Sequence, residues 1–295
     1  MLEGTAEDAA TRVFADHREL LFSIVYNLLG SVADTEDVLQ DTWLAWAARH
    51  RAGAGDDIEN PRAYLVRIAV NAAFARQADI SRRRETYPGP WLPEPLVSEA
   101  DAGVAAERTD AVSMALLVVL ETLTPLERAV FVLHEVFGYA HTEIAEILDR
   151  SPAAVRQLAH RAREHVRARR PRHRADPKVR RQVTERFLQA ALGGDLGALL
   201  ELLAPDVTFW RDSGEARGPL RPLHGRERVA RVIAAHGKDA ERLEVRYRTV
   251  NGDPSAVLFD ADAPFAVMVL DVDGDRVTGV YAVANPDKLT HVDDE

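Results

Sequence analysis

The sequence contains no cysteine, which excludes disulfide bonds, thiolate nucleophiles and every zinc site built on cysteine. Its ten histidines lack the spacing of metal ligands, so we expect no metal site and no cofactor. It has no apolar run of the roughly 18 residues that a membrane span needs, and its acidic N-terminal stretch lacks the apolar core of a signal peptide. These absences favour a protein of the reducing cytoplasm that does not enter a membrane.

Charge is unevenly distributed along the chain. Of the 295 residues, 46% are hydrophobic and 28% charged, enough apolar material for the cores of two or three domains. The formal net charge is −10, yet residues 150–181 contain only two acids, Glu164 and Asp176, among many arginines. A focused basic segment in an acidic protein is typical of a site for a polyanion. A basic, solvated linker is the alternative interpretation.

The stretch HTEIAEILDRSPAAVRQLAHRARE, residues 141–164, predicts a helix-turn-helix motif. Thr142 is expected to cap the first helix, and Ser151 and Pro152 to begin the second. Asp149 stands where a turn glycine is usual, and aspartate tolerates the left-handed conformation. The second helix would fit the DNA major groove, although an ordinary helical hairpin with a charged outer face is the alternative. Its candidate DNA-contacting residues are Ser151, Arg156, Gln157, His160, Arg161 and Arg163.

The remaining sequence changes character twice. Apolar residues recur at helical spacing over 6–50, and a second helical pattern follows the Asn60-Pro61 cap signal. Four prolines within 88–95 indicate an extended linker. From residue 177 onwards, two helices, a strand, a further helix and four strands predict an α+β domain with a curved antiparallel sheet.

Three segments together resemble the extracytoplasmic-function sigma factors of RNA polymerase. DTEDVLQDTWLAW (34–46) is similar to the part that docks on the β′ clamp coiled coil, and NPRAYLVRIAVNAAFAR (60–76) to the part that melts and reads the −10 promoter element. Residues 124–164 resemble region 4, which reads the −35 element. This resemblance implies a protein that directs core polymerase to promoters and initiates transcription, and that is not an enzyme itself.

The C-terminal part resembles a SnoaL-like domain, which one group of these sigma factors carries as an extension. That group's motifs are present as WLPEP (91–95) and NPDKL (285–289), whereas a third, glycine-rich motif is degraded to WRDSGEAR (210–217). The resemblance implies control in cis by this domain, without a separate anti-sigma factor. The residues expected to carry that control are Trp91, Leu92, Pro93, Glu94, Pro95, Asn285, Pro286, Asp287, Lys288 and Leu289.

The implied fold is multidomain: two all-α sigma domains, a region 2 helical bundle and a region 4 helix-turn-helix, plus a C-terminal α+β SnoaL-like cone-shaped barrel. The expected boundaries are 1–84 for region 2, 85–107 for the proline-rich linker, 108–170 for region 4, 171–176 for a short basic linker and 177–295 for the SnoaL-like domain.

The implied partners are core RNA polymerase, through its β′ clamp coiled coil and β subunit, and promoter DNA with its −35 and −10 elements. Candidate polymerase contacts are Asp34, Asp37, Leu39, Gln40, Asp41 and Trp43. Candidate −10 contacts are Arg62, Arg67, Asn71 and Arg76. In the family the linker runs through polymerase channels, which implies the same path for this linker.

Two other classes of function stay open. SnoaL-like folds include enzymes with an acid/base group in an apolar cone, and an aspartate near a histidine suits that chemistry. The candidate pocket residues are Trp210, Asp212, His224 and Tyr281, although His224 is also placed to cap the next helix. Under this alternative, the chain would be a SnoaL-like enzyme or ligand sensor fused to a helix-turn-helix regulator. A dimeric repressor that binds a palindrome is the third possibility.

Overall fold

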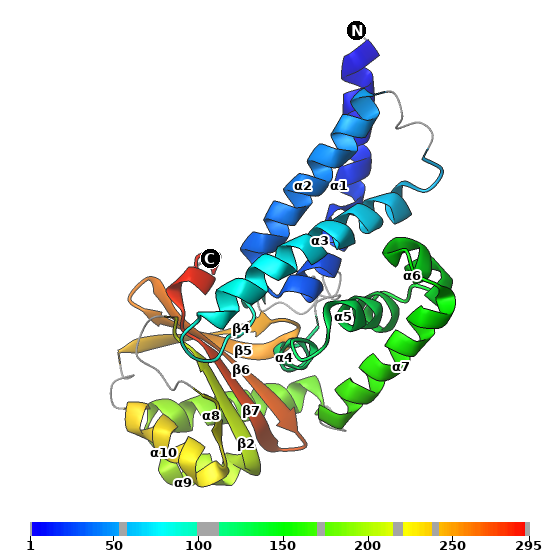
Figure 1. The fold of residues 1–295 in the computed structure, drawn as a ribbon. Coiled ribbons are helices and arrows are strands. Elements are labelled where there is room, and N and C mark those ends of the chain that lie inside the picture. The colour runs from blue at the N-terminus through cyan, green and yellow to red at the C-terminus, as the bar shows by residue number, and fades with distance from the viewer. Residues whose placement is uncertain are drawn as a thin grey trace. The chain divides into compact units, whose positions relative to one another are not determined.

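The computed structural model describes residues 2–52, 58–98, 112–169, 175–214, 221–237 and 242–292. The chain divides into two compact units, one formed by Met1–Glu85 with Val119–Ala168 and the other by Thr86–Val118 with Arg169–Glu295. Figure 1 traces both by colour from the N- to the C-terminus. No helix in the described ranges combines the length and the apolar character that crossing a membrane requires.

The first unit is helical. Its elements are α1 (Leu2–Leu29), α2 (Val32–Arg51), α3 (Pro61–Glu85), α5 (Pro125–Phe131), the π-helical stretch η2 (Val132–Val136), α6 (His141–Leu148) and α7 (Pro152–Arg169). Local signals set several starts: the Ser31 hydroxyl accepts a hydrogen bond from Asp34 N, and the Asn60 side chain accepts one from Ala63 N. Buried apolar side chains of α1, α2 and α3 form one core, in which the Trp46 indole donates to Ala10 O at 2.9 Å.

The helix-turn-helix motif is confirmed, with one difference at its first residue. The first helix begins at His141, and the Glu143 carboxylate accepts a hydrogen bond from Ala140 N at 2.7 Å, so the predicted capping by Thr142 is wrong. Alanine has no side-chain acceptor, so only the glutamate half of a capping box is present, and it satisfies the Ala140 N–H. Asp149 adopts the left-handed conformation with φ 52°, and the Ser151 hydroxyl caps the second helix, both as predicted.

The second unit contains a seven-stranded sheet in the order β1-β4-β5-β6-β7-β2-β3. Its strands are β1 (Val97–Ser98), β2 (Leu203–Asp212), β3 (Leu223–His224), β4 (Leu243–Val250), β5 (Asp253–Asp260), β6 (Ala263–Asp273) and β7 (Arg276–Val283). The prediction of an antiparallel sheet is wrong at one pairing, because β2 lies parallel to β7. The chain leaves β2 through β3 and a helix, and the β4–β7 meander returns to β2 with β7 running in the same direction.

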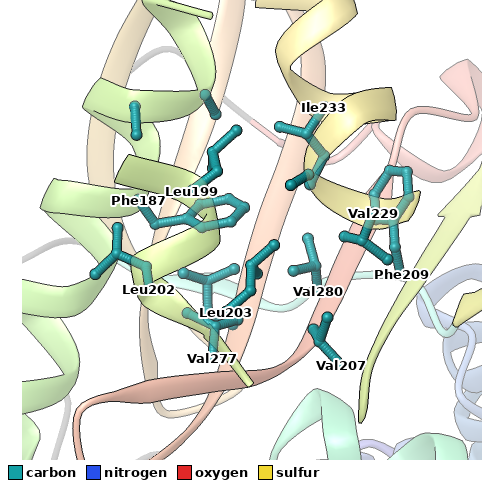
Figure 2. Packing of buried hydrophobic residues seen from close by; sticks show 14 of the residues in the cluster. Phe187, Leu199, Leu202, Leu203, Val207, Phe209, Val229, Ile233, Val277 and Val280 are labelled. Carbon is teal, nitrogen blue, oxygen red and sulfur yellow. The ribbon is translucent and has the colours of Figure 1, made fainter. Parts of the chain in front are cut away.

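The two faces of this sheet have different covers. The helices α8 (Pro177–Leu192), α9 (Leu196–Leu202) and α10 (Arg226–Gly237) pack on one face, where Phe187, Phe209 and Ile233 belong to a common core (Figure 2). On the opposite face, Phe259 and Tyr281 cluster with three groups of residues that come from outside the sheet. These are Leu92 of the linker, Met114 at the start of α4 (Met114–Leu120), and Leu289 and Val292 of the tail. Linker and tail therefore form part of the core of this unit.

Candidate functional site

The second helix of the helix-turn-helix, α7, presents part of the predicted DNA-reading set to solvent. Ser151, Arg156, Gln157 and His160 are exposed. Arg161 and Arg163 instead reach back to neighbouring helices, with Nε 3.2 Å from Glu127 and 3.1 Å from Glu135 respectively. Arg161 is also exposed, with 64% of its side chain open to solvent, whereas Arg163 is half-buried. Both arginines form ion pairs within the motif, and contact with base edges stays a prediction for this set.

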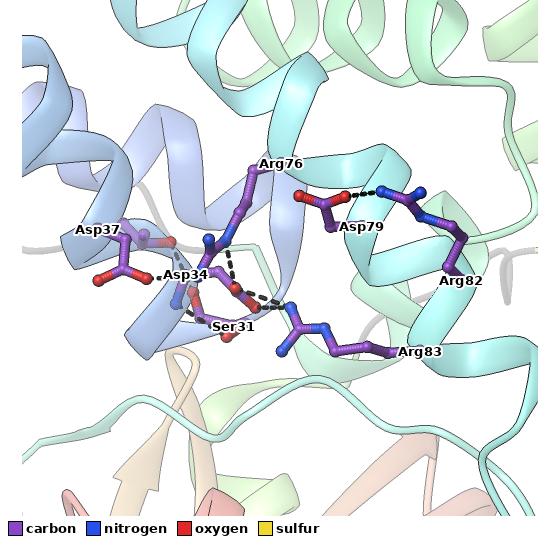
Figure 3. Close-up of polar contacts among 8 residues, drawn as sticks. Ser31, Asp34, Asp37, Arg76, Asp79, Arg82 and Arg83 are labelled. Atoms are coloured by element: carbon purple, nitrogen blue, oxygen red, sulfur yellow. Dashed lines mark hydrogen bonds and ion pairs between the residues drawn. The ribbon is translucent and has the colours of Figure 1, made fainter.

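Asp34, at the start of α2, lies at the centre of an ion-pair cluster with α3 (Figure 3). Only 3% of it is exposed, and its carboxylate accepts hydrogen bonds from Arg76 at 2.6 Å and from Arg83 at 2.7 Å. Burial alone would raise the pKa of Asp34, but the hydrogen bonds from Arg83 and Arg76 hold it below its usual value. Arg76 also pairs with Asp37. Two predicted polymerase contacts and one predicted −10 contact are therefore joined to each other.

The other predicted polymerase contacts separate into core and surface. Leu39 is 2% exposed and belongs to the core of the helical unit, so it supports α2 instead of offering a contact. Gln40 and Asp41 are exposed, and the half-buried Trp43 ring packs 5.4 Å from Phe14. Leu44, whose exposed fraction of 51% is high for a large apolar side chain, completes an acidic and apolar surface on α2.

On α3, two predicted −10 contacts are open and two are engaged. Arg67 and Asn71 are exposed. Arg62 lies over the Tyr139 ring, with its Cζ 5.3 Å from the ring centroid. Arg76 is the second engaged residue, because it pairs with Asp34. The Arg62 contact joins α3 to the segment that precedes α6.

A buried charge network also connects the segments of the first unit. Arg128 on α5 is 1% exposed and donates from Nε to Asn27 O at 2.9 Å and from Nη1 to Glu121 at 2.6 Å. Glu121 also pairs with Arg84 at the end of α3. Burial would raise the pKa of Glu121, but Arg128 and Arg84 hold it below its usual value. Arg128 thus connects α5 to α1 directly and to α3 through Glu121, within the first unit.

In the second unit, five residues from three distant segments meet in what we call the linker–tail cluster: Tyr87 and Leu92 of the linker, Asp212 of β2, and Asn285 and Lys288 of the tail. The Asp212 side chain has no solvent exposure. It accepts hydrogen bonds from the Tyr87 hydroxyl and from Leu92 N at 2.8 Å, and it pairs with Lys288 Nζ at 2.7 Å. Lys288 Nζ donates to Leu92 O at 2.5 Å, and Asn285 Nδ2 to the Tyr87 hydroxyl at 2.9 Å.

Neighbouring residues of the same three motifs reinforce this cluster. The ammonium of Lys288 lies 3.5 Å from the centroid of the Trp91 ring. The His291 ring contacts Pro95 O at 2.7 Å. Gly214 has φ +60°, and a Cβ at that position would lie 2.8 Å from the Asn285 side-chain oxygen. The degraded third motif therefore still supplies Asp212 and Gly214 to the contact between WLPEP and NPDKL.

Of the predicted regulatory residues, Leu92, Pro93, Pro95, Asn285, Lys288 and Leu289 are buried, Trp91 and Glu94 are half-buried, and Pro286 and Asp287 are exposed. Tyr87, which was not predicted from the sequence, joins two motifs through its hydroxyl: it donates to Asp212 and accepts from Asn285. Burial and the bond to Asp212 raise the pKa of Tyr87, so it stays protonated and donates. Its only signal in the sequence is an aromatic residue four positions before Trp91.

In the parts of the chain that the structure describes, the linker and tail cover the sheet face of most of the predicted pocket residues, and the role of these residues in a pocket stays a prediction. Trp210 and Tyr281 pair across β2 and β7 and share the sheet face that the linker and tail cover, and Asp212 is on the same face. His224 lies exposed on the short strand β3, where its ring contacts the Thr208 hydroxyl at 3.2 Å. The face that Trp210, Asp212 and Tyr281 share is filled by the linker and the tail.

Comparison with known proteins matches three family models along the chain. Residues 13–83 match the model for Sigma-70 region 2, residues 113–166 that for Sigma-70 region 4, and residues 184–291 that for a SnoaL-like domain. The chain belongs to the extracytoplasmic-function (ECF) RNA polymerase sigma factors, as a member with a C-terminal SnoaL-like domain.

Among its relatives is the ECF RNA polymerase sigma factor SigJ of Mycobacterium tuberculosis, with 36% identity over 92% of this chain and 91% of that protein. The crystal structure of SigJ superposes with a TM-score of 0.74 and covers 94% of this chain and 97% of that one. A probable ECF sigma factor of the same organism, SigI, is 30% identical over 96% of this chain and 95% of its own length.

Proposed function

We propose that this sigma factor binds core RNA polymerase mainly through α2 and reads promoter DNA through α7 at the −35 element and α3 at the −10 element. The exposed Gln40, Asp41 and Leu44 supply an acidic and apolar docking surface. Arg156 and Gln157 suit base edges in a major groove, and Asn71 with Arg67 suits unstacked bases and backbone. The polymerase performs the chemistry in the cytoplasm, and this chain supplies binding energy.

Control in cis is the second part of the proposal, and the linker–tail cluster is the observation that carries it. A linker that must enter polymerase channels cannot at the same time be packed in the core of the C-terminal unit. Asp212 and Lys288 form a buried ion pair. Removal of one partner from such a pair lowers the free energy of unfolding by about 3–5 kcal/mol. The cluster therefore holds the linker away from the polymerase, and no separate anti-sigma factor is required for that step.

A reconstituted assay tests the first part. Purified chain is mixed with sigma-free core polymerase, and we expect stoichiometric capture together with initiation from specific promoters. Binding to a palindrome as a dimer without polymerase would favour a repressor, and turnover of a small molecule without any capture would favour an enzyme fused to a DNA-binding module. Either result would refute the assignment of α2 and α3.

The role of Asn71 is tested separately with Asn71→Ala, and Ser81→Ala on the exposed side of the same helix is the matched control. We expect Asn71→Ala to reduce promoter opening, measured by permanganate reactivity of unpaired thymines, while the affinity for core polymerase stays unchanged. Loss of core binding with normal opening in the residual complex would contradict a base contact at Asn71.

A further inference from the structure

The second unit contains a cavity that the motifs above do not use. It has a volume of about 470 Å³ and lies between the helices α8 and α10 and the sheet face that they cover. Most of its lining is apolar, including Phe209, Val232, Ile233, Leu258, Phe265 and Met268. Figure 2 shows Phe209 and Ile233 beside the core of this face. The volume falls in the range of about 300–1,000 Å³ that is usual for small-molecule sites.

One cation in this apolar lining has no acidic partner in the described parts of the chain. Arg211 follows Phe209 on the same face of β2, is half-buried, and donates from Nε to the Ser213 hydroxyl at 3.0 Å. Burial lowers the pKa of Arg211, because the charged form loses hydration there. Arg242, which also lines the cavity, differs, because it pairs with Asp260 at 3.0 Å.

We propose that this cavity binds a small amphipathic carboxylate, with its apolar body against the aromatic and aliphatic lining and its carboxylate on the guanidinium of Arg211. A guanidinium holds a carboxylate through two parallel hydrogen bonds, and partial burial strengthens such a pair. A neutral apolar molecule would leave Arg211 without a counter-ion, and a polyanion would not match the apolar lining.

The site is distinct from the linker–tail cluster, although one strand serves both. Side chains alternate along β2, so Phe209 and Arg211 face the cavity, whereas Trp210 and Asp212 face the linker. Binding needs neither polymerase nor DNA, so the proposal is tested independently of the proposed function.

Calorimetric titration of the full-length protein tests the proposal, with octanoate, decanoate and dodecanoate as probes and the matching n-alkanols as uncharged controls. We expect saturable binding of one carboxylate per chain, with affinity that rises about fourfold for each added methylene until the cavity is filled. Each alkanol should bind at least about tenfold more weakly than its carboxylate, because a charged hydrogen bond is lost.

The variant Arg211→Gln should weaken carboxylate binding about tenfold or more and leave alkanol binding unchanged. Arg242→Gln is the matched control, since it removes a lining arginine that already has a partner, and should change affinity by less than about twofold. Absence of carboxylate binding to the folded wild-type protein would overturn the proposal. Equal affinity for alkanol and carboxylate would overturn it too, and this comparison holds even if Arg211→Gln does not fold.

Discussion

At the residue scale, Asp34 shows how one side chain can support two interfaces. Its position in an acidic helix start suggests a surface contact for polymerase, yet the structure buries it under Arg76 and Arg83. The cluster joins α2, the helix proposed to dock on polymerase, to α3, the helix proposed to read DNA, through ion pairs. We therefore propose that Asp34 affects both partners indirectly, through the position of these helices, and that the exposed residues of α2 make the polymerase contacts.

The substitution Asp34→Asn should lower the free energy of unfolding of the helical unit by roughly 1.5–3 kcal/mol at neutral pH, because two charge-assisted hydrogen bonds are lost. Glu36→Gln is the control, since its pair with Arg18 is about half exposed and should contribute only about 0–1 kcal/mol. Urea unfolding measures both. An Asp34→Asn effect no larger than that of Glu36→Gln would contradict a stabilising cluster.

The pH dependence of this effect follows from the lowered pKa of Asp34. The stabilisation is complete above the unfolded-state value of about 3.9 and is lost as the pH falls through the lower pKa of the folded state. The difference between wild type and Asp34→Asn should therefore shrink in acid below that window. A difference that grows on acidification would show that the pKa of Asp34 is raised by folding.

Gly214 permits a second test at the residue scale. Gly214→Ala introduces a Cβ 2.8 Å from the Asn285 oxygen at φ +60°, whereas Gly274→Ala introduces one at the same φ with no atom within 4 Å. Backbone strain of about 1–2 kcal/mol is common to both. We expect Gly214→Ala to destabilise the second unit more than Gly274→Ala in thermal unfolding. Equal losses would mean that the tail does not press on Gly214.

At the element scale, alternation along β2 explains what could be predicted from the sequence and what could not. Period-two patterning places Trp210 and Asp212 on one face of β2, but Tyr281 joins them only through the register between β2 and β7. Whether a face of the sheet leaves a cavity depends on the residues that pack on it. The face with Trp210 and Tyr281 is covered by residues 86–98 and 285–292, which are far away in the chain and which strand patterns do not reveal. Local patterns also do not predict the strand β1, because a strand of two residues forms only through its pairing with β4.

Helix boundaries were easier to predict, because caps are local. Pro152 after Ser151 acts within one turn and appears in the structure where the sequence indicates it. The structure also shows a capping box at Thr124, which is equally local. The start of α6 shows where such prediction fails. Threonine is a common N-cap residue, so Thr142 was predicted there, but the helix begins after Ala140, and Glu143 accepts a hydrogen bond from Ala140 N.

The reading helix α7 gives a prediction at this scale. Arg156→Ala should reduce holoenzyme affinity at particular −35 bases by about 1–3 kcal/mol and relax specificity there. Arg167→Ala, further along the same helix and exposed, should weaken binding to all sequences to the same extent, as a phosphate contact does. Competition binding with −35 variants separates the two. Equal losses on every sequence for Arg156→Ala would show that it contacts only the backbone.

At the scale of the whole molecule, the boundary between the units does not follow the order of the chain. Thr86–Val118, which contains the linker and the start of the region 4 match, belongs with the C-terminal part, while Met1–Glu85 and Val119–Ala168 form the other unit. The C-terminal unit thus holds the segment that connects the two DNA-reading regions. A change in the linker–tail cluster alters that connection without touching either DNA-reading helix, which is why we place control of initiation there.

Multiple-round run-off transcription with core polymerase tests this most directly, by comparison of wild type with Lys288→Met. Asp287→Ala is the matched control, because Asp287 is the exposed neighbour in the same motif. Removal of Lys288 weakens the packing of the linker by about 3–5 kcal/mol, and about 1.4 kcal/mol already corresponds to a tenfold shift. We therefore expect at least roughly tenfold more transcript from Lys288→Met and no change from Asp287→Ala. Equal output from Lys288→Met and wild type would contradict control of initiation by the linker–tail cluster.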